Sequence, residues 1–60
     1  MTKEEFVLNL MENDREGIDA MTEERAAEIL DWMRADDEDN KIPKDLTAAE
    51  LAEIWNRIKG

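Results

Sequence analysis

Apolar residues recur at intervals of three and four positions in three separate segments of the chain. These positions are Phe6, Val7, Leu10 and Met11, then Ala26, Ile29, Leu30 and Met33, and finally Leu51, Ile54, Trp55 and Ile58. Such spacing places the apolar side chains on one face of an α-helix, and none of the segments alternates as a β-strand would. The pattern therefore predicts three amphipathic helices.

A threonine stands immediately before each helical pattern, at Thr2, Thr22 and Thr47, and the chain has no serine. Threonine is a favourable N-cap because its side-chain oxygen accepts a hydrogen bond from a backbone N–H of the first turn. Glu5 and Glu50 follow the first and third threonine by three residues, which is the spacing of a capping box. These residues predict where the helices begin.

The ends of the helices are marked less clearly. Gly17 is a plausible residue to stop the first helix, because glycine readily adopts the left-handed conformation after a helix end. Pro43 prevents the second helix from running directly into the third. We therefore expect helices over residues 3–15, 23–36 and 48–59, with boundaries uncertain by about 2–4 residues.

The segments between the helices also contain apolar residues, namely Ile18, Met21, Ile42 and Leu46. We expect these side chains to lie beneath the helix ends. The chain has no repeat, no low-complexity segment and no flexible Gly/Ser linker. The predicted fold is thus a single all-α three-helix domain over residues 1–60.

Several residue types that catalysis commonly uses are missing. There is no histidine, cysteine, serine or tyrosine, and the only glycines are Gly17 and Gly60. The usual acid–base residue, the serine and thiol nucleophiles and a glycine-rich phosphate loop are therefore excluded. Paired carboxylates would need a pocket that three short helices leave little room for. We expect a non-catalytic protein with no cofactor.

The net charge is −9, and it is unevenly distributed. Residues 1–39 contain 14 acidic and 4 basic residues, whereas residues 40–60 contain 3 acidic and 4 basic residues. Direct binding to nucleic acid or to anionic membranes is disfavoured, because both attract lysine and arginine. A basic protein surface is the favoured partner. No apolar run approaches the ~20 residues of a membrane helix, and we expect a cytoplasmic protein with neither signal peptide nor anchor.

Four consecutive acids, Asp36-Asp37-Glu38-Asp39, lie between the second and third predicted helices. Part of residues 35–46 resembles the calcium loop of EF-hand proteins, since four residues have the spacing of loop positions 3, 5, 6 and 8: Asp37, Asp39, Asn40 and Ile42. However, Ala35 and Leu46 stand where the first aspartate and the last glutamate belong, and Asp45 falls one residue early. We expect no specific metal site. Asp37, Asp39 and Asp45 are weak candidates in the alternative of a cation-responsive helix–loop–helix.

Two further interpretations of the four acids are open. They form a solvated helix end, although negative charge is unfavourable at a helix C-terminus. Alternatively, they join the acids of the first two helices in one negative face that attracts a basic protein surface. Such a face would mimic nucleic-acid phosphates in an inhibitor or adaptor encoded by a bacterium or its phage, a comparison based on size and composition only.

Two large apolar residues lie away from the predicted core faces, Trp32 on the second helix and Leu8 on the first. Trp32 is about 60° from Ile29 around the helix axis. We expect its indole to fold over the core, as a tryptophan at the rim of so small a domain usually does. In the alternative, Trp32, Leu8 or both belong to an interface, either with a basic partner or in a homodimer.

The favoured functional hypothesis is an acidic protein-binding module. Its predicted partner-binding residues are Asp31, Trp32, Asp36, Asp37, Glu38, Asp39 and Leu8, with the acids providing charge and Trp32 the apolar anchor. A structural or designed mini-domain with no natural ligand is the remaining alternative.

Overall fold

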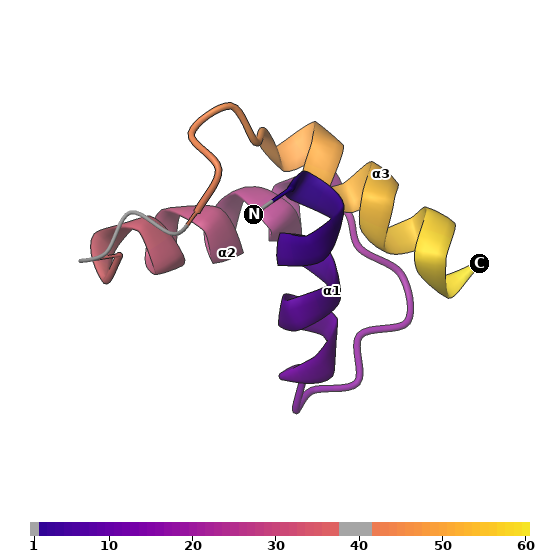
Figure 1. Ribbon diagram of the computed structural model, residues 1–60. Coiled ribbons are helices and arrows are strands. Elements are labelled where there is room, and N and C mark those ends of the chain that lie inside the picture. The colour runs from indigo at the N-terminus through magenta and orange to yellow at the C-terminus, as the bar shows by residue number, and fades with distance from the viewer. Residues whose placement is uncertain (1, 38–41) are drawn as a thin grey trace.

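The computed structural model describes residues 2–37 and 42–60, and within them the chain forms three α-helices and no strand (Figure 1). The helices are α1 (Lys3–Glu12), α2 (Glu23–Ala35) and α3 (Ala48–Lys59). The predicted all-α three-helix fold is confirmed. The N-termini agree with the sequence expectation, and the C-terminus of α1 does not.

All three threonines cap helices as predicted. The side-chain oxygen of Thr2 accepts a hydrogen bond from the backbone N–H of Glu5 at 3.1 Å. Thr22 accepts one from Arg25 at 3.1 Å, and Thr47 accepts one from Glu50 at 3.2 Å. Each helix therefore starts where a local hydrogen bond satisfies a backbone donor that the helix itself leaves unpaired.

The first helix ends at Glu12, three residues earlier than predicted, and Gly17 does not terminate it. The backbone N–H of Asn13, the C-cap residue, donates to the carbonyls of Asn9 and Leu10 at 3.2 Å. The Asp14 carboxylate then accepts hydrogen bonds from the backbone N–H groups of Glu16, at 3.2 Å, and Ile18, at 2.7 Å. Asp14 thus offers the backbone an alternative to further helix, as aspartate often does in turns.

Both α1 and α2 pack against α3, and no Cα atom of α1 lies within 8 Å of a Cα atom of α2. Figure 1 shows α1 and α2 leaving the region of α3 in different directions. Trp55 in the centre of α3 is 1% exposed, and Leu51 and Val7 are fully buried. Trp55, one of the apolar positions of the third predicted helix, thus lies in the core, and α3 is the helix around which the core is built.

The connecting segments contribute to this core. Met21, Ile42 and Leu46 are all buried, and Ile18 packs against the core cluster while remaining partly exposed. Every buried residue among those described is hydrophobic. The expectation that the linkers lie beneath the helix ends is therefore confirmed.

Polar contacts attach the loop between α1 and α2 to α3. The side-chain amide of Asn56 accepts a hydrogen bond from the backbone N–H of Met21 and donates one to its carbonyl, both at 2.8 Å. The indole N–H of Trp55 donates to the carbonyl of Ile18 at 3.3 Å. These contacts hold the loop against α3 and therefore fix its position relative to the helices.

Candidate functional site

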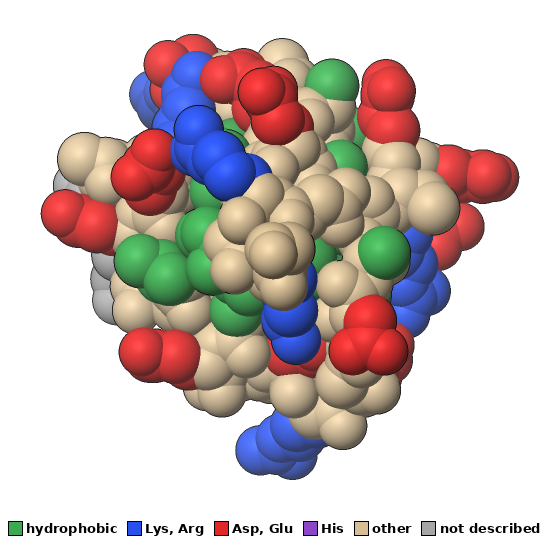
Figure 2. All heavy atoms as spheres, turned by 90° about the vertical axis from the view of Figure 1, so that its right-hand side faces the viewer, with side chains coloured by type: hydrophobic (Ala, Val, Ile, Leu, Met, Phe, Trp, Pro, Cys, Tyr) green, Lys and Arg blue, Asp and Glu red, His purple; other side chains and the backbone are tan. Residues whose placement is uncertain are grey.

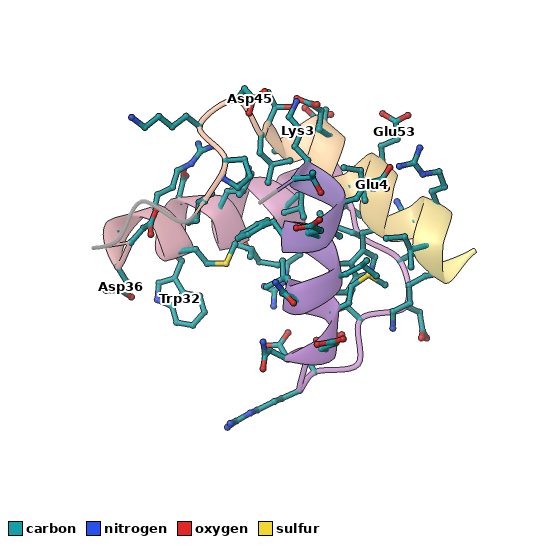
Figure 3. All side chains as sticks on the ribbon, in the orientation of Figure 1. Lys3, Glu4, Trp32, Asp36, Asp45 and Glu53 are labelled. Atoms are coloured by element: carbon teal, nitrogen blue, oxygen red, sulfur yellow. The ribbon has the colours of Figure 1, made fainter. Side chains whose placement is uncertain are left out.

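Trp32 does not fold over the core, and that expectation was wrong. Its side chain projects from α2 into solvent, and the residue is 72% exposed (Figure 3). The physical reason is the arrangement of the helices. Because α1 packs on α3 and stays away from α2, no neighbouring helix covers the side of α2 on which Trp32 lies.

Two of the predicted acidic residues flank Trp32. Asp31 precedes it on α2, and both residues are exposed. Asp36 is the C-cap of α2, one helical turn after Trp32, and both side chains point to the same side of the helix in Figure 3. This end of α2 therefore combines a large apolar side chain with exposed carboxylates.

The remaining acids of the predicted stretch differ from Asp31 and Asp36. Asp37 is partly buried, and its carboxylate accepts a hydrogen bond from the backbone N–H of Ile42 at 3.3 Å. Glu38 and Asp39 lie outside the residues that the structure describes. Asp37 therefore contributes to the structure of the loop end as well as to its charge.

Leu8, the other large apolar residue of the predicted site, is 45% exposed. It follows Glu4 by one turn of α1, and the Glu4 carboxylate forms an ion pair of 2.9 Å with Arg57 of α3. Ile58, the next residue of α3, is 40% exposed, because the last turn of α3 projects beyond the other helices (Figure 1). Leu8 thus lies on the side of α1 that forms the ion pair with α3.

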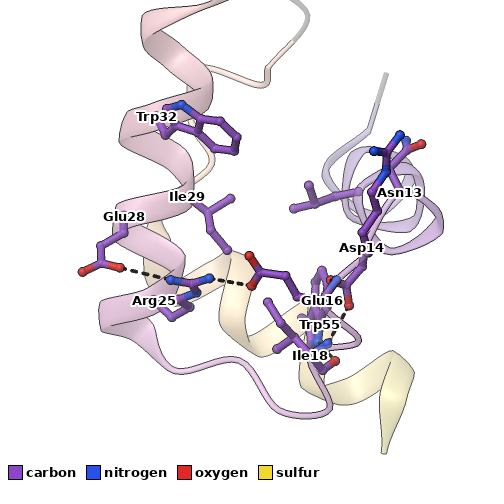
Figure 4. Close-up of a pocket in the computed structure, with 11 residues that line it drawn as sticks. Asn13, Asp14, Glu16, Ile18, Arg25, Glu28, Ile29, Trp32 and Trp55 are labelled. Carbon is purple, nitrogen blue, oxygen red and sulfur yellow. Dashed lines mark hydrogen bonds and ion pairs between the residues drawn. The ribbon is translucent and has the colours of Figure 1, made fainter.

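A groove of about 430 Å³ lies between α1 and α2, beside Trp32 (Figure 4). Its apolar lining comes from all three helices and the loop between α1 and α2: Leu10, Ile18, Ile29, Trp32 and Trp55. It exists because the two helices diverge from α3, which leaves their facing sides only partly covered. The sequence spacing contained no signal for this groove.

An ion-pair cluster forms one margin of the groove. The Arg25 guanidinium lies 2.7 Å from the Glu16 carboxylate and 3.5 Å from that of Glu28 (Figure 4). All three side chains are between 45% and 67% exposed, so the pairs are screened by water. Two carboxylates share one guanidinium here, and the cluster retains negative charge.

The acids of α1 and α2 do not all lie on the side of the domain that carries Trp32 and Asp36. Glu4 is turned toward Arg57 of α3, on a different side from Trp32 and Asp36 (Figure 3). In Figure 2, acidic side chains are scattered over the visible face, with basic and apolar side chains between them. The face seen in Figure 2 therefore carries charges of both signs.

Lys3 occupies the centre of another ion-pair cluster, at the N-termini of α1 and α3. Its ammonium group lies 2.6 Å from the Glu50 carboxylate and 3.3 Å from that of Asp45. The hydrogen bond to Glu50 raises the pKa of Lys3 above its usual value, and Asp45 adds to this effect. The same hydrogen bond lowers the pKa of Glu50.

The position of Asp45 bears on the EF-hand resemblance. Its carboxylate pairs with Lys3, and the adjacent Leu46 is 1% exposed in the core. No group of three or more acidic side chains that could hold a metal ion occurs in residues 2–37 and 42–60. Asp39 and Asn40, the other candidate positions, fall outside that range. Asp45 thus pairs with Lys3, whereas the Asp37 carboxylate accepts from the backbone N–H of Ile42.

The sequence patterns did not predict the structural roles of three residues, Asn56, Arg25 and Asp14. Asn56 looks like an ordinary polar residue on the outer face of a helix, and Arg25 looks like a defect in a capping box. A signal did exist for Asp14, because Asp followed by Gly three residues later is typical of a turn. For Asn56, and for the pairing of Arg25 with Glu16, the partner lies outside the helix, and no helical spacing indicates it.

Comparisons with family models, with curated proteins and with solved structures each found no match to this chain. None of the helices that the structure describes is long and apolar enough to cross a membrane. The chemistry of the candidate site therefore has to be derived from its own residues.

Proposed function

We propose that this protein is a non-catalytic, acidic binding module that recognises a basic surface on another protein. The observation that supports this most directly is the exposure of Trp32, 72% of its surface, between the carboxylates of Asp31 and Asp36. Tryptophan is enriched among the residues that dominate binding energy at protein interfaces.

The charge of the protein supports a basic partner. The net charge of −9 would speed the approach of a positively charged surface, an effect that falls with ionic strength. The most specific form of the proposal is an inhibitor that occupies a site built for nucleic acid. In that form the carboxylates at the end of α2, with Glu38 and Asp39 following in sequence, take the place of phosphates.

The proposal is tested by capture from cell lysate with three versions of the protein as bait: the wild type, Asp36→Lys and Glu53→Lys. The two substitutions change the net charge equally, and Glu53 lies on α3, well apart from Trp32 (Figure 3). We expect a basic partner to associate more slowly with Asp36→Lys and to bind Glu53→Lys almost as it binds the wild type. Equal binding to both variants would show that the acids at the end of α2 do not form the recognition site.

A further inference from the structure

We propose that the groove between α1 and α2 is the docking site for an amphipathic basic helix of the partner protein. This helix would insert large apolar side chains between Leu10, Ile29 and Trp32 and would direct its lysines or arginines toward Glu16 and Glu28. The inference rests on the proposed function, because it names the element of the basic partner that the site recognises.

The shape of the groove favours a helix. One wall is α2, and the other is formed by Leu10 near the end of α1 together with the loop that follows it. No Cα atom of α1 approaches one of α2 within 8 Å. Its volume of about 430 Å³ is partly open to solvent, so side chains of a partner can enter it. An amphipathic helix placed in an apolar groove is a recurring mode of peptide recognition, with anchors at positions i, i+3 or i+4, and i+7.

The lining of the groove favours apolar anchors. Leu10 and Ile29 are only half-buried, and Trp32 is largely exposed. A helix in the groove would cover these three side chains and would approach Ile18 and Trp55 at its floor. Burial of apolar area of this kind is the main favourable term in protein association.

The charges at the margin favour a basic helix and disfavour a second copy of this chain. Arg25 lies between the carboxylates of Glu16 and Glu28 and neutralises only one of these two charges. Asp14 and Arg15 also line the groove, so its lining holds three carboxylates and two guanidinium groups, a net charge of −1. The Asp14 carboxylate is partly satisfied by its backbone hydrogen bonds. Two copies with a net charge of −9 each would repel one another, whereas a cationic helix would be attracted.

Arg25 then competes with the partner for the same carboxylates. Removing its charge would leave Glu16 and Glu28 free to pair with an incoming lysine or arginine. We therefore expect Arg25→Gln to bind a basic amphipathic peptide several times more tightly than the wild type does. Arg57→Gln is the matched control, because it changes the net charge equally but breaks only the pair with Glu4 at the seam of α1 and α3.

The probe is a synthetic peptide of about four helical turns with leucines at helical spacing and lysines at most other positions. A second peptide of the same charge replaces each leucine by alanine. Binding is followed by titration of two-dimensional amide and indole NMR spectra, which separate the Trp32 and Trp55 signals. Sedimentation of the protein alone establishes first that it is monomeric at the concentration used.

Saturable shifts at Leu10, Ile29 and the Trp32 indole with the leucine peptide support the inference. Trp32→Ala should weaken binding about tenfold or more without changing the melting temperature, because the side chain is exposed. Affinity should rise for Arg25→Gln and change little for Arg57→Gln.

Other results would overturn the inference in distinguishable ways. Equal affinity for the two peptides would exclude the groove as the docking site but would leave the acidic binding surface standing. No binding of either peptide, together with no partner captured by the wild-type bait, would contradict both proposals. Concentration-dependent self-association that shifts the groove signals would show that a second copy covers it.

Discussion

The side-chain amide of Asn56 pairs with both backbone polar groups of Met21, a residue 35 positions earlier in the chain. Its oxygen accepts from the Met21 N–H, and its nitrogen donates to the Met21 carbonyl, each at 2.8 Å. The two hydrogen bonds join the loop between α1 and α2 to the outer side of α3. They also satisfy backbone groups of a residue whose own side chain lies in the core.

Replacing this amide should reduce stability more than its surface location suggests. We expect Asn56→Ala to lower the free energy of unfolding by about 1–2 kcal/mol, since two hydrogen bonds are lost and the Met21 backbone loses its partner. Asn9→Ala, at an exposed position of α1, should change it by less than about 0.5 kcal/mol. Urea denaturation followed by circular dichroism measures both, and equal effects would mean that the contact with Met21 is not formed.

Leu46 and Leu8 provide a matched test of the core. Leu46 lies in a connecting segment and is 1% exposed, whereas Leu8 lies within a helix and is 45% exposed. Leu46→Ala should cost about 2–5 kcal/mol, because it opens a cavity in a close-packed interior. Leu8→Ala should cost less than about 1 kcal/mol.

The total stability of a domain of this size is only roughly 3–9 kcal/mol, from ~0.05–0.15 kcal/mol per residue. Leu46→Ala should therefore show a measurable unfolded population by circular dichroism at 37 °C, and Leu8→Ala should not. If Leu8→Ala proved the more damaging, the arrangement of the connecting segment over the core would be wrong.

Gly17 adopts a positive φ of 67° in the loop after α1, and a Cβ atom there would meet no other atom within 4 Å. A side chain at position 17 would therefore destabilise the protein only through the backbone conformation and not through a steric clash. Gly17→Ala should destabilise the protein by about 1–2 kcal/mol, because L-residues disfavour the left-handed region.

Gly17→Asn is the informative comparison, since asparagine tolerates that region better than alanine does. We expect its melting temperature to lie between those of the wild type and Gly17→Ala. An alanine variant as stable as the asparagine variant would show that this residue does not keep a positive φ in solution.

The ion pair between Lys3 and Glu50 should make stability depend on pH in a defined way. The pKa of Glu50 is lowered from its usual 4.5, so the contribution of the pair is complete above pH 4.5 and disappears as the pH falls through the folded-state pKa. The pKa of Lys3 is raised from 10.5, so the contribution is complete below pH 10.5 and is lost as the pH rises further.

Comparison of the wild type with Glu50→Gln isolates this pair from the other carboxylates. The difference in their free energies of unfolding should be constant near neutral pH and should vanish in acid. Chemical denaturation at a series of pH values measures it, with Glu53→Gln as an exposed control on the same helix. A difference that persisted in strong acid would mean that Glu50 acts by packing or capping and not through its charge.

The two tryptophans should differ in their fluorescence. Trp55 is 1% exposed and Trp32 is 72% exposed. In Trp32→Phe, the remaining emission should lie at shorter wavelength and should resist quenching by acrylamide. Trp55→Phe should leave emission that acrylamide quenches readily. Similar quenching of the two variants would contradict the exposed position of Trp32.

The sequence by itself determined the three helices and most of the core. Thr2, Thr22 and Thr47 define the helix starts, because each cap is a hydrogen bond to a backbone group only three residues away. The apolar spacing of α3 identified Trp55 as central for a similar reason, since residues within a few turns share a face whatever surrounds the helix. Ile58 shares that face but is 40% exposed. Burial also requires another element to pack on that face, and the last turn of α3 projects beyond the other helices (Figure 1).

Tertiary structure alone decided the candidate site. Trp32 is exposed, and the groove beside it exists, because α1 packs on α3 and leaves the facing side of α2 uncovered. The pairs of Arg25 with Glu16 and of Asn56 with Met21 likewise join segments that are separate in the chain. Helix formation depends on contacts within one or two turns, which a sequence displays directly. The angles at which helices pack depend on side-chain fit between distant segments, and no local pattern specifies them.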